Sequence, residues 1–579
     1  MLLRKGTPGF SKGALPAVLG IAMLLLVGCS GSSPPGNPPA TSPSLIFSTY
    51  LGGSQPCLGC TTARTFGQNA ASDAAGNTYV TGATEAADLP VTNQTSLAPG
   101  ATLAAFVAKY DPFGKLLWCT YLGGNGKSMG TGVAVTPLGG VAVVGITNSA
   151  GAARFPTTPN AYQSQNAGST DYFVSVYDAS GNLLYSTYLG GSGDEGDNTF
   201  SDDNSNGNNI AVDAQGLVYI TGTTNSGGGG GGAKFPVTSN ALQSDMHGPT
   251  DAILAIINPA TSGASSLVYS SFLGGAKNEK GHGVAVDPTG SLIVVVGYTD
   301  SDDFPVTPNA FRQTHPASGW TSNGFITEFK SDTPGSLSSS YSMTYSTYLG
   351  GKTSAARDDA YAVTLTPAGT IVATGRTESA DFFTPVLPVP SIYNTAPDPK
   401  ATSRNDQPYI VKIDPTLSCT ASLVYGTFLG GGSTTGGGGA FCTGVVVDAA
   451  GSTYVGGETD STGVLYQYSS SPAVAPELFP YTSDALRTSL QGSFDAIFMQ
   501  VSPDGGTLTY STFLGGTDSD RAYGMAVDAL GNVAVSGLTF SSNFPTVNAW
   551  QPKPNNLSTG KENAFVAKFG RGTVRYPPP

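Results

Sequence analysis

Oxygen-bearing side chains gather in one stretch of the sequence, SGDEGDNTFSDDNSNGNN at residues 192–209. Within it Asp202, Asn204 and Asn206 stand in D-x-N-x-N-G spacing, which presents oxygens on alternate residues and a glycine at the bend that a calcium loop requires. The twelfth position would be Asp213, where such loops usually carry glutamate, and this aspartate also belongs to a hairpin turn. We therefore favour a solvated acidic loop and keep a calcium site as the alternative.

A second set of polar residues follows a Gly-x-Thr pattern that recurs along the chain. The position after the threonine is occupied by Glu85, Asn148, Asn225, Asp300, Glu378, Asp460 and Phe540. These side chains either cap turns, which is the favoured interpretation, or ring a common site. For ligand contacts we predict the four acids of this set, together with Trp320 and Tyr393 in long polar segments.

No catalytic signature accompanies these residues. His247, His282 and His315 are the only histidines, they are widely separated, and we interpret them as solvated loop or turn residues. The sequence contains no G-x-S-x-G, P-loop or H-E-x-x-H motif. Carboxylates could still meet after folding at the separation that a glycosidase needs, but the sequence alone does not place them there.

The first cysteine, Cys29, closes a segment with basic residues near its start and an apolar run over residues 14–27. A run of this length is too short to span a bilayer, which takes about 20 residues. The string LVGC at 26–29 resembles the lipobox of a bacterial lipoprotein, which implies cleavage before Cys29 and lipidation of its sulfur; an ordinary secretory signal is the alternative. Residues 1–28 are then a signal peptide, and the Pro/Gly/Ser-rich residues 29–44 form a tether.

Four other cysteines suggest disulfides of an exported protein. Cys57 and Cys60 form a C-x-x-C pair, which we interpret as a local disulfide in preference to a redox or metal motif, and Cys419 with Cys442 is a plausible second bridge. The remaining one, Cys119, is expected to be a buried free thiol.

Composition and charge limit the fold class and the kinds of molecule that the protein is expected to bind. The chain of 579 residues carries 78 glycines, 40 prolines and only 11% charged residues, with 39% hydrophobic residues, which is turn-rich, β-leaning and apolar enough for a core. The net charge of -13 argues against nucleic acid and anionic lipid as direct partners.

The positions of all these residues depend on a repeat. The word YSTYLGG and its variants occur seven times, with leucines at 51, 122, 189, 273, 349, 429 and 514. Each copy of this word belongs to a repeat unit with four apolar runs. An Asp-x-x-Gly turn separates the first two runs, and a loop that usually contains Phe-Pro precedes the third. Seven four-stranded units predict an all-β, seven-bladed β-propeller. The chain starts with a fourth run and ends with a third, so residues 45–51 should complete the last blade.

The words YSTYLGG, AVD-x-x-GN, FP-x-T and AFVAK resemble the bacterial SBBP propeller repeats of secreted and cell-surface proteins. This resemblance implies architecture over residues 45–570, followed by a tail at 571–579, and carries no catalytic motif. The long links fall on one predicted face, where rigid scaffolds place function. We expect a monomeric lipoprotein of the outer membrane or cell surface that binds a glycan, a peptide or an envelope protein. A glycan-active hydrolase or lyase and a purely structural spacer are the alternatives.

Overall fold

The computed structural model describes residues 42–92, 97–151, 154–196, 200–201, 207–315, 322–333, 339–352, 356–379, 381–383, 406–430, 439–466, 478–555 and 562–571. All of them belong to one compact unit, Ser42–Pro579. Among the described residues, no helix has the length and apolar character needed to cross a membrane.

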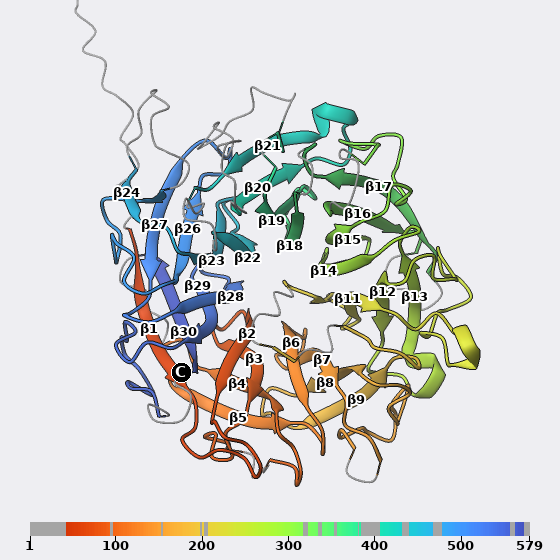
Figure 1. Ribbon diagram of the computed structural model, residues 1–579, viewed down its shortest axis with the longest axis horizontal. Coiled ribbons are helices and arrows are strands. Elements are labelled where there is room, and N and C mark those ends of the chain that lie inside the picture. The colour runs from red at the N-terminus through yellow and green to blue at the C-terminus, as the bar shows by residue number, and fades with distance from the viewer. Residues whose placement is uncertain are drawn as a thin grey trace, which may run out of the picture. The chain divides into compact units, whose positions relative to one another are not determined.

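Seven four-stranded antiparallel sheets are arranged as a β-propeller, which confirms the predicted fold (Figure 1). We number the blades I to VII in chain order. The strands of blades I to III are β2 Thr65–Ser72, β3 Thr78–Thr84, β4 Ala104–Tyr110 and β5 Leu116–Leu122; β6 Ser128–Val135, β7 Val141–Thr147, β8 Asp171–Tyr177 and β9 Leu183–Leu189; and β10 Ile210–Val212, β11 Val218–Thr224, β12 Asp251–Ile257 and β13 Leu267–Leu273.

The later blades repeat the same plan from the inner strand outward. Their strands are β14 Glu279–Val286, β15 Leu292–Thr299, β16 Asn323–Ser331 and β17 Tyr341–Leu349; β18 Asp358–Leu365, β19 Ile371–Thr377, β20 Gln407–Ile413 and β21 Leu423–Phe428; β22 Phe441–Val447, β23 Thr453–Thr459, β26 Asp495–Val501 and β27 Leu508–Leu514; and β28 Asp520–Val527, β29 Val533–Thr539, β30 Asn563–Arg571 and β1 Pro43–Leu51. A short parallel pair, β24 Gly463–Leu465 with β25 Phe479–Tyr481, and the 3-10 turns η2 Gly229–Gly231, η3 Gly263–Ser266 and η4 Cys419–Ser422 lie in the links.

The first strand of the chain closes the ring, as the sequence predicted. Strand β1 pairs antiparallel with β30, from Pro43 opposite Arg571 to Leu51 opposite Ala564, so blade VII has no exposed edge at this point. A fully buried lysine adds to this closure: within blade VII, Lys568 Nζ lies 2.8 Å from Asp528 Oδ2, and it donates a hydrogen bond of 2.6 Å to the carbonyl of Gly76 in blade I. Blade VII is therefore bound to blade I by side chains as well as by packing.

The repeated words fit together in space, which explains why they recur together. In blade II the serine of the word, Ser186, donates a hydrogen bond of 2.6 Å to the carbonyl of Pro156 in the Phe-Pro loop. The second tyrosine, Tyr188, donates to the carbonyl of Ser149, and its oxygen accepts from the amide of Phe155. Equivalent serine-to-proline bonds occur at Ser270, Ser346 and Ser511. The word thus holds the loop between the second and third strands against the outer strand.

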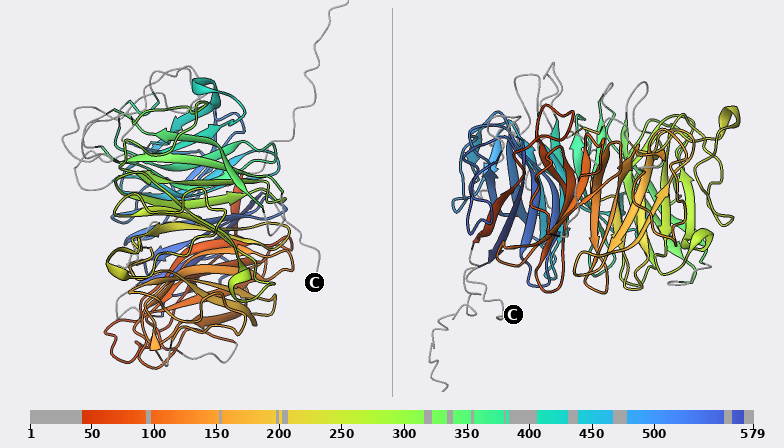
Figure 2. Two further views of the ribbon diagram at one scale, coloured as in Figure 1. Left: turned by 90° about the vertical axis from the view of Figure 1, so that its right-hand side faces the viewer. Right: turned by 90° about the horizontal axis from the view of Figure 1, so that it is seen from below.

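Long and short links lie on opposite faces of the ring (Figure 2). Links between the second and third strands, and from one blade to the next, occupy the long-loop face; the hairpin turns after the first and third strands occupy the short-turn face. Pro43 and its partner Arg571 lie at the short-turn end of blade VII. The chain therefore enters and leaves the propeller on the face opposite its longest links.

Candidate functional site

The four acids predicted as ligand contacts lie on the long-loop face, and Glu85, Asp300 and Glu378 are bonded within their own blades. Arg64 Nη2 donates to Glu85 Oε1 at 2.7 Å, Asn278 Nδ2 donates to Asp300 Oδ2 at 3.2 Å, and the amide of Arg357 donates to Glu378 Oε2 at 3.1 Å. Asp460, which is half-buried, occupies the same position after β23. No group of three or more histidine, cysteine, aspartate or glutamate side chains forms a metal site in the described part of the chain.

Several predicted residues lie outside the described ranges: Cys29, Trp320, Tyr393, Asp202, Asn204 and Asn206. The calcium loop can be judged only at Asp213. Its Oδ1 accepts hydrogen bonds of 2.9 Å from the amides of Gln215 and Leu217, and its Oδ2 accepts one of 2.8 Å from the Tyr219 hydroxyl. This carboxylate is already engaged by its hairpin turn.

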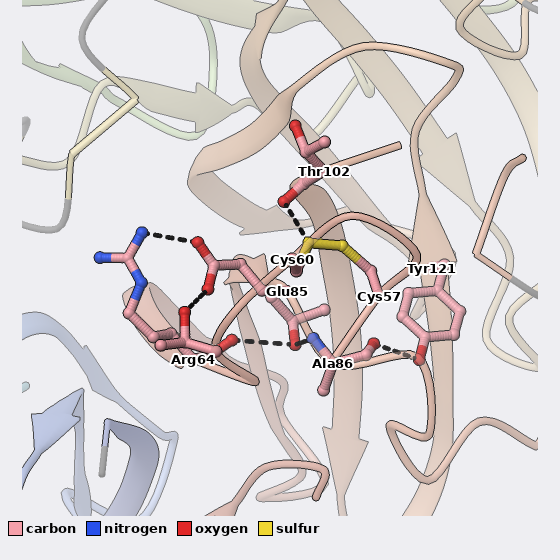
Figure 3. Close-up of a disulfide and its surroundings, with 9 residues drawn as sticks. Cys57, Cys60, Arg64, Glu85, Ala86, Thr102 and Tyr121 are labelled. Carbon is pink, nitrogen blue, oxygen red and sulfur yellow. Dashed lines mark hydrogen bonds and ion pairs between the residues drawn. A yellow bond between two sulfur atoms is a disulfide. The ribbon is translucent and has the colours of Figure 1, made fainter. Parts of the chain in front are cut away.

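The cysteines agree with the sequence interpretation at one pair and depart from it at the other. Cys57 and Cys60 form a disulfide in the link that leads into blade I (Figure 3). Cys419 and Cys442 are both free, so the bridge between them predicted from the sequence is wrong. Cys419 lies exposed in η4, before the outer strand of blade V, whereas Cys442 is buried in β22, the inner strand of blade VI. Burial raises the pKa of the Cys442 and Cys119 thiols to about 12, so neither is a reactive thiolate.

The interpretation of all three histidines as solvated is wrong for two of them. His282 is 3% exposed and stacks on Tyr361 with ring centroids 5.0 Å apart. It is the extra residue of a β-bulge, because the register of β14 shifts between Gly281 and Gly283. The His315 ring packs against Tyr348, and its Nε2 lies 2.9 Å from the side-chain amide of Asn323.

The bulge at His282 is one of six that line the centre of the ring. Six inner strands shift register at the equivalent place, and the extra residues are Gln68, Thr131, His282, Tyr361, Thr443 and Tyr523, each at most 4% exposed. Blade III differs, because β10 has only three residues. The segment that precedes it takes another path.

Residues 207–209 of blade III cross the central channel. The Asn208 amide donates to the carbonyl of Val363 in blade V at 2.6 Å, and its backbone carbonyl accepts from Val284 in blade IV at 2.8 Å. The Asn209 amide donates to Thr131 in blade II at 2.8 Å. Gly207 passes so close to Tyr361 that an added Cβ would lie 1.8 Å from the tyrosine carbonyl. Residues 207–209 thus lie across the axis of the ring and are bonded to blades on different sides of it.

Three junctions between blades each bury two carboxyl groups, a feature that the sequence did not place. The pairs are Asp171 with Glu195, Asp251 with Glu279, and Asp495 with Asp520, and all six side chains are 0% exposed. In each pair one acid starts the third strand of a blade. Glu279 and Asp520 start the inner strand of the next blade, and Glu195 lies in the link that leads to that strand. Both acids of each pair face the first glycine of the LGG link: a Cβ on Gly274 would lie 2.6 Å from Glu279 Oε2 and 2.8 Å from Asp251 Oδ1.

The environment of these pairs favours their protonated forms. Burial raises the pKa of Glu279 and Asp520 to about 7 and that of Asp495 to about 6, and it also raises the pKa of Asp171, Glu195 and Asp251. A neighbouring carboxylate adds to this effect, because two like charges at short range do not both ionise. Since water does not reach these acids, they are closed to a substrate and belong to the scaffold.

The long-loop face contains a cavity of about 230 Å³ beside the disulfide, at the junction of blades I and II. Its lining includes Arg64, Glu85, Thr102 and Lys127, together with Phe200 from the segment that leads toward the channel. Figure 3 shows Arg64 and Glu85 facing each other next to Cys60. A second cavity of about 380 Å³ lies over Asn225 and Ser226 in blade III. Of the predicted contact residues, Glu85 lines the first of these cavities.

Comparisons with known proteins add little to this geometry. No family model matches the chain, and no curated protein matches its sequence. Among solved structures it is similar to a protein of unknown function from Dyadobacter fermentans (12% identity, 76% of this chain and 94% of that one, TM-score 0.34). It is also similar to a quinohemoprotein alcohol dehydrogenase from Comamonas testosteroni (10%, 93% and 78%, TM-score 0.37) and to the phage phi92 endosialidase (10%, 92% and 70%, TM-score 0.37). At these values the likeness carries no argument about function. The class that the fold defines is a seven-bladed β-propeller repeat protein.

Proposed function

We propose that this chain is an exported, lipid-anchored recognition protein of the bacterial envelope, built from SBBP-type repeats, whose long-loop face binds a glycan, a peptide or an envelope protein without chemical conversion. The observation that carries the proposal is the asymmetry of the ring. Long links lie on one face, where the repeated words hold the loops between the second and third strands against their blades. A rigid frame with variable loops is suited to recognition.

The arrangement of polar groups supports binding over catalysis. The predicted acids Glu85, Asp300 and Glu378 are bonded to neighbours in their own blades, and the carboxyl pairs that do meet are closed to solvent. Acid-base chemistry on a glycan requires two carboxyl groups that both reach the substrate.

The position of the chain ends supports the anchor. Because Pro43 lies at the short-turn end of β1, a lipid on Cys29 would hold that face toward the membrane and leave the long-loop face exposed to the surroundings. The tether would allow some tilt.

Two measurements test the proposal with the full chain. Metabolic labelling with palmitate should mark the wild type and not Cys29→Ser, and unlabelled wild type would contradict the anchor. The purified chain should bind a subset of a glycan array or a cell-envelope extract without altering the bound sugar. Release of shortened sugars would instead establish an enzyme.

A further inference from the structure

The cavity between blades I and II combines rigid positioning with mixed charge. Arg64 and Glu85 form its fixed wall. The backbone amide of Glu85 donates to the carbonyl of Arg64 at 2.8 Å, and the side chains pair at 2.7 Å. The Thr62 hydroxyl also donates to the Glu85 carboxylate. The disulfide lies a few residues before Arg64, so the loop that presents this wall has little freedom (Figure 3).

Lys127, which also lines the cavity, carries a second positive charge. Lys127 is exposed, and its ammonium lies 5.9 Å from the centre of the Phe200 ring. Within the described ranges, no carboxylate forms an ion pair with Lys127, whereas Arg64 is shared between Glu85 and, at 3.7 Å, Glu562. Among the described residues, Lys127 is therefore the cation at this cavity that no carboxylate pairs with.

These groups select among anionic ligands. A carboxylate or a phosphate would satisfy Lys127 equally. Glu85, however, accepts hydrogen bonds and repels a second negative oxygen, so a ligand that fills the cavity must present hydroxyl donors beside its anion. Thr102 and Phe200, which also line the cavity, add a polar residue and an aromatic residue.

We propose that this cavity binds one carboxylated sugar residue of a polysaccharide, of the hexuronic acid class. The sugar carboxylate pairs with Lys127, ring hydroxyls donate to Glu85, and the apolar edge of the ring rests against Phe200. A cavity of about 230 Å³ admits a single pyranose ring. This inference rests on the proposed function, because it names the ligand class for one site of the same face.

Isothermal titration of the full chain with hexuronate oligosaccharides (galacturonate, glucuronate and mannuronate) and with their neutral counterparts tests it. We expect at least one acidic oligosaccharide to bind at least tenfold more tightly than its neutral counterpart, with an affinity that falls as salt is added. Lys127→Gln should weaken that binding at least tenfold. The matched control is Lys277→Gln, an exposed lysine in the equivalent link before blade IV that pairs with Asp302, and it should change nothing.

The outcomes separate this inference from the proposed function. If an acidic oligosaccharide binds but Lys127→Gln binds it as well as the wild type, the cavity is the wrong site and the recognition role stands. If neutral and acidic oligosaccharides bind alike, the ligand class is wrong. If none binds and the glycan array and envelope extract are also negative, both proposals fail.

Discussion

Two junctions of the ring bury charged groups in opposite ways. Where blade VII meets blade I, Lys568 and Asp528 form an ion pair, and both side chains are 0% exposed. Where blade III meets blade IV, two acids, Asp251 and Glu279, share an equally closed site, and no cation among the described residues forms an ion pair with either of them. The first pair is stable when both members are charged, whereas the second requires a proton. The ion pair lies within blade VII, beside blade I, whereas the two acids come from two neighbouring blades, and pH distinguishes the two arrangements.

The largest expected effect comes from breaking the closing pair. Lys568→Met leaves Asp528 buried without its cation, which typically costs about 3–5 kcal/mol of unfolding free energy. Chemical unfolding followed by fluorescence measures it. The double variant Lys568→Met/Asp528→Asn should recover part of the loss, because no charge then stays buried. A single variant as stable as the wild type would show that the pair does not support closure.

A pH titration should separate the two junctions. Burial lowers the pKa of Lys568; for Asp528, the pKa-raising effect of burial is outweighed by Lys568 and Asn532, which lower it. Asp528 therefore adds stability that is lost as pH falls through its folded pKa. Glu279 has a raised folded pKa of about 7 instead of 4.5, so its contribution is complete below about 4.5 and is lost as pH rises toward 7. At about 1.4 kcal/mol per pKa unit, this loss is roughly 3 kcal/mol.

We therefore expect the melting temperature to be highest in mildly acidic solution and to fall from about pH 5 to pH 7. The variant Asp251→Asn introduces the amide that blade IV carries at the equivalent position, Asn323. It should make the melting temperature depend less steeply on pH, because one of the acid pairs is removed. Differential scanning calorimetry across the pH range gives the slopes. An unchanged slope in Asp251→Asn would contradict the shared-proton interpretation.

The smallest expected effect comes from replacing the link glycine at two junctions, one that buries two carboxyl groups and one that does not. A Cβ at Gly274 would meet Glu279 Oε2 at 2.6 Å, whereas at Gly123, between blades I and II, the nearest atom is Ser128 Oγ at 3.3 Å. Gly274→Ala should cost about 1–3 kcal/mol by displacing a buried carboxyl group, and Gly123→Ala less than about 1 kcal/mol. Equal melting temperatures of the two variants would show that the carboxyl group moves freely.

The repeated words were sufficient to predict the scaffold, because they encode contacts made within each repeat. Counting YSTYLGG gave the number of blades, and the unmatched copy at residue 47 predicted the closure by β1. The hydrogen bond from Ser186 to the Phe-Pro loop shows why these words recur together.

Features that depend on a shift of strand register, or on residues far apart in sequence, escaped prediction. His282 is buried because a bulge directs an otherwise polar position toward its neighbours, and Asn208 leaves its own blade to bond with Val363, 155 residues away. The acid pairs form only when the LGG link folds back and brings Asp251 next to Glu279. The one signal in the sequence was the aspartate that opens DAILAII and DAIFMQV, whose partner lies in the next repeat.

The pairing of Pro43 with Arg571 has a consequence for how the gene could be rearranged. The two ends of the propeller are neighbouring residues of one hairpin-like pair, so a short turn could join them, and the chain could be cut instead at another short turn. Each such circular permutant would move the split blade to a new place and keep every strand pairing. Blade III differs from the other blades as a place to cut, because its segment 207–209 bonds to four other blades. A cut beside this segment would detach the residues that cross the axis.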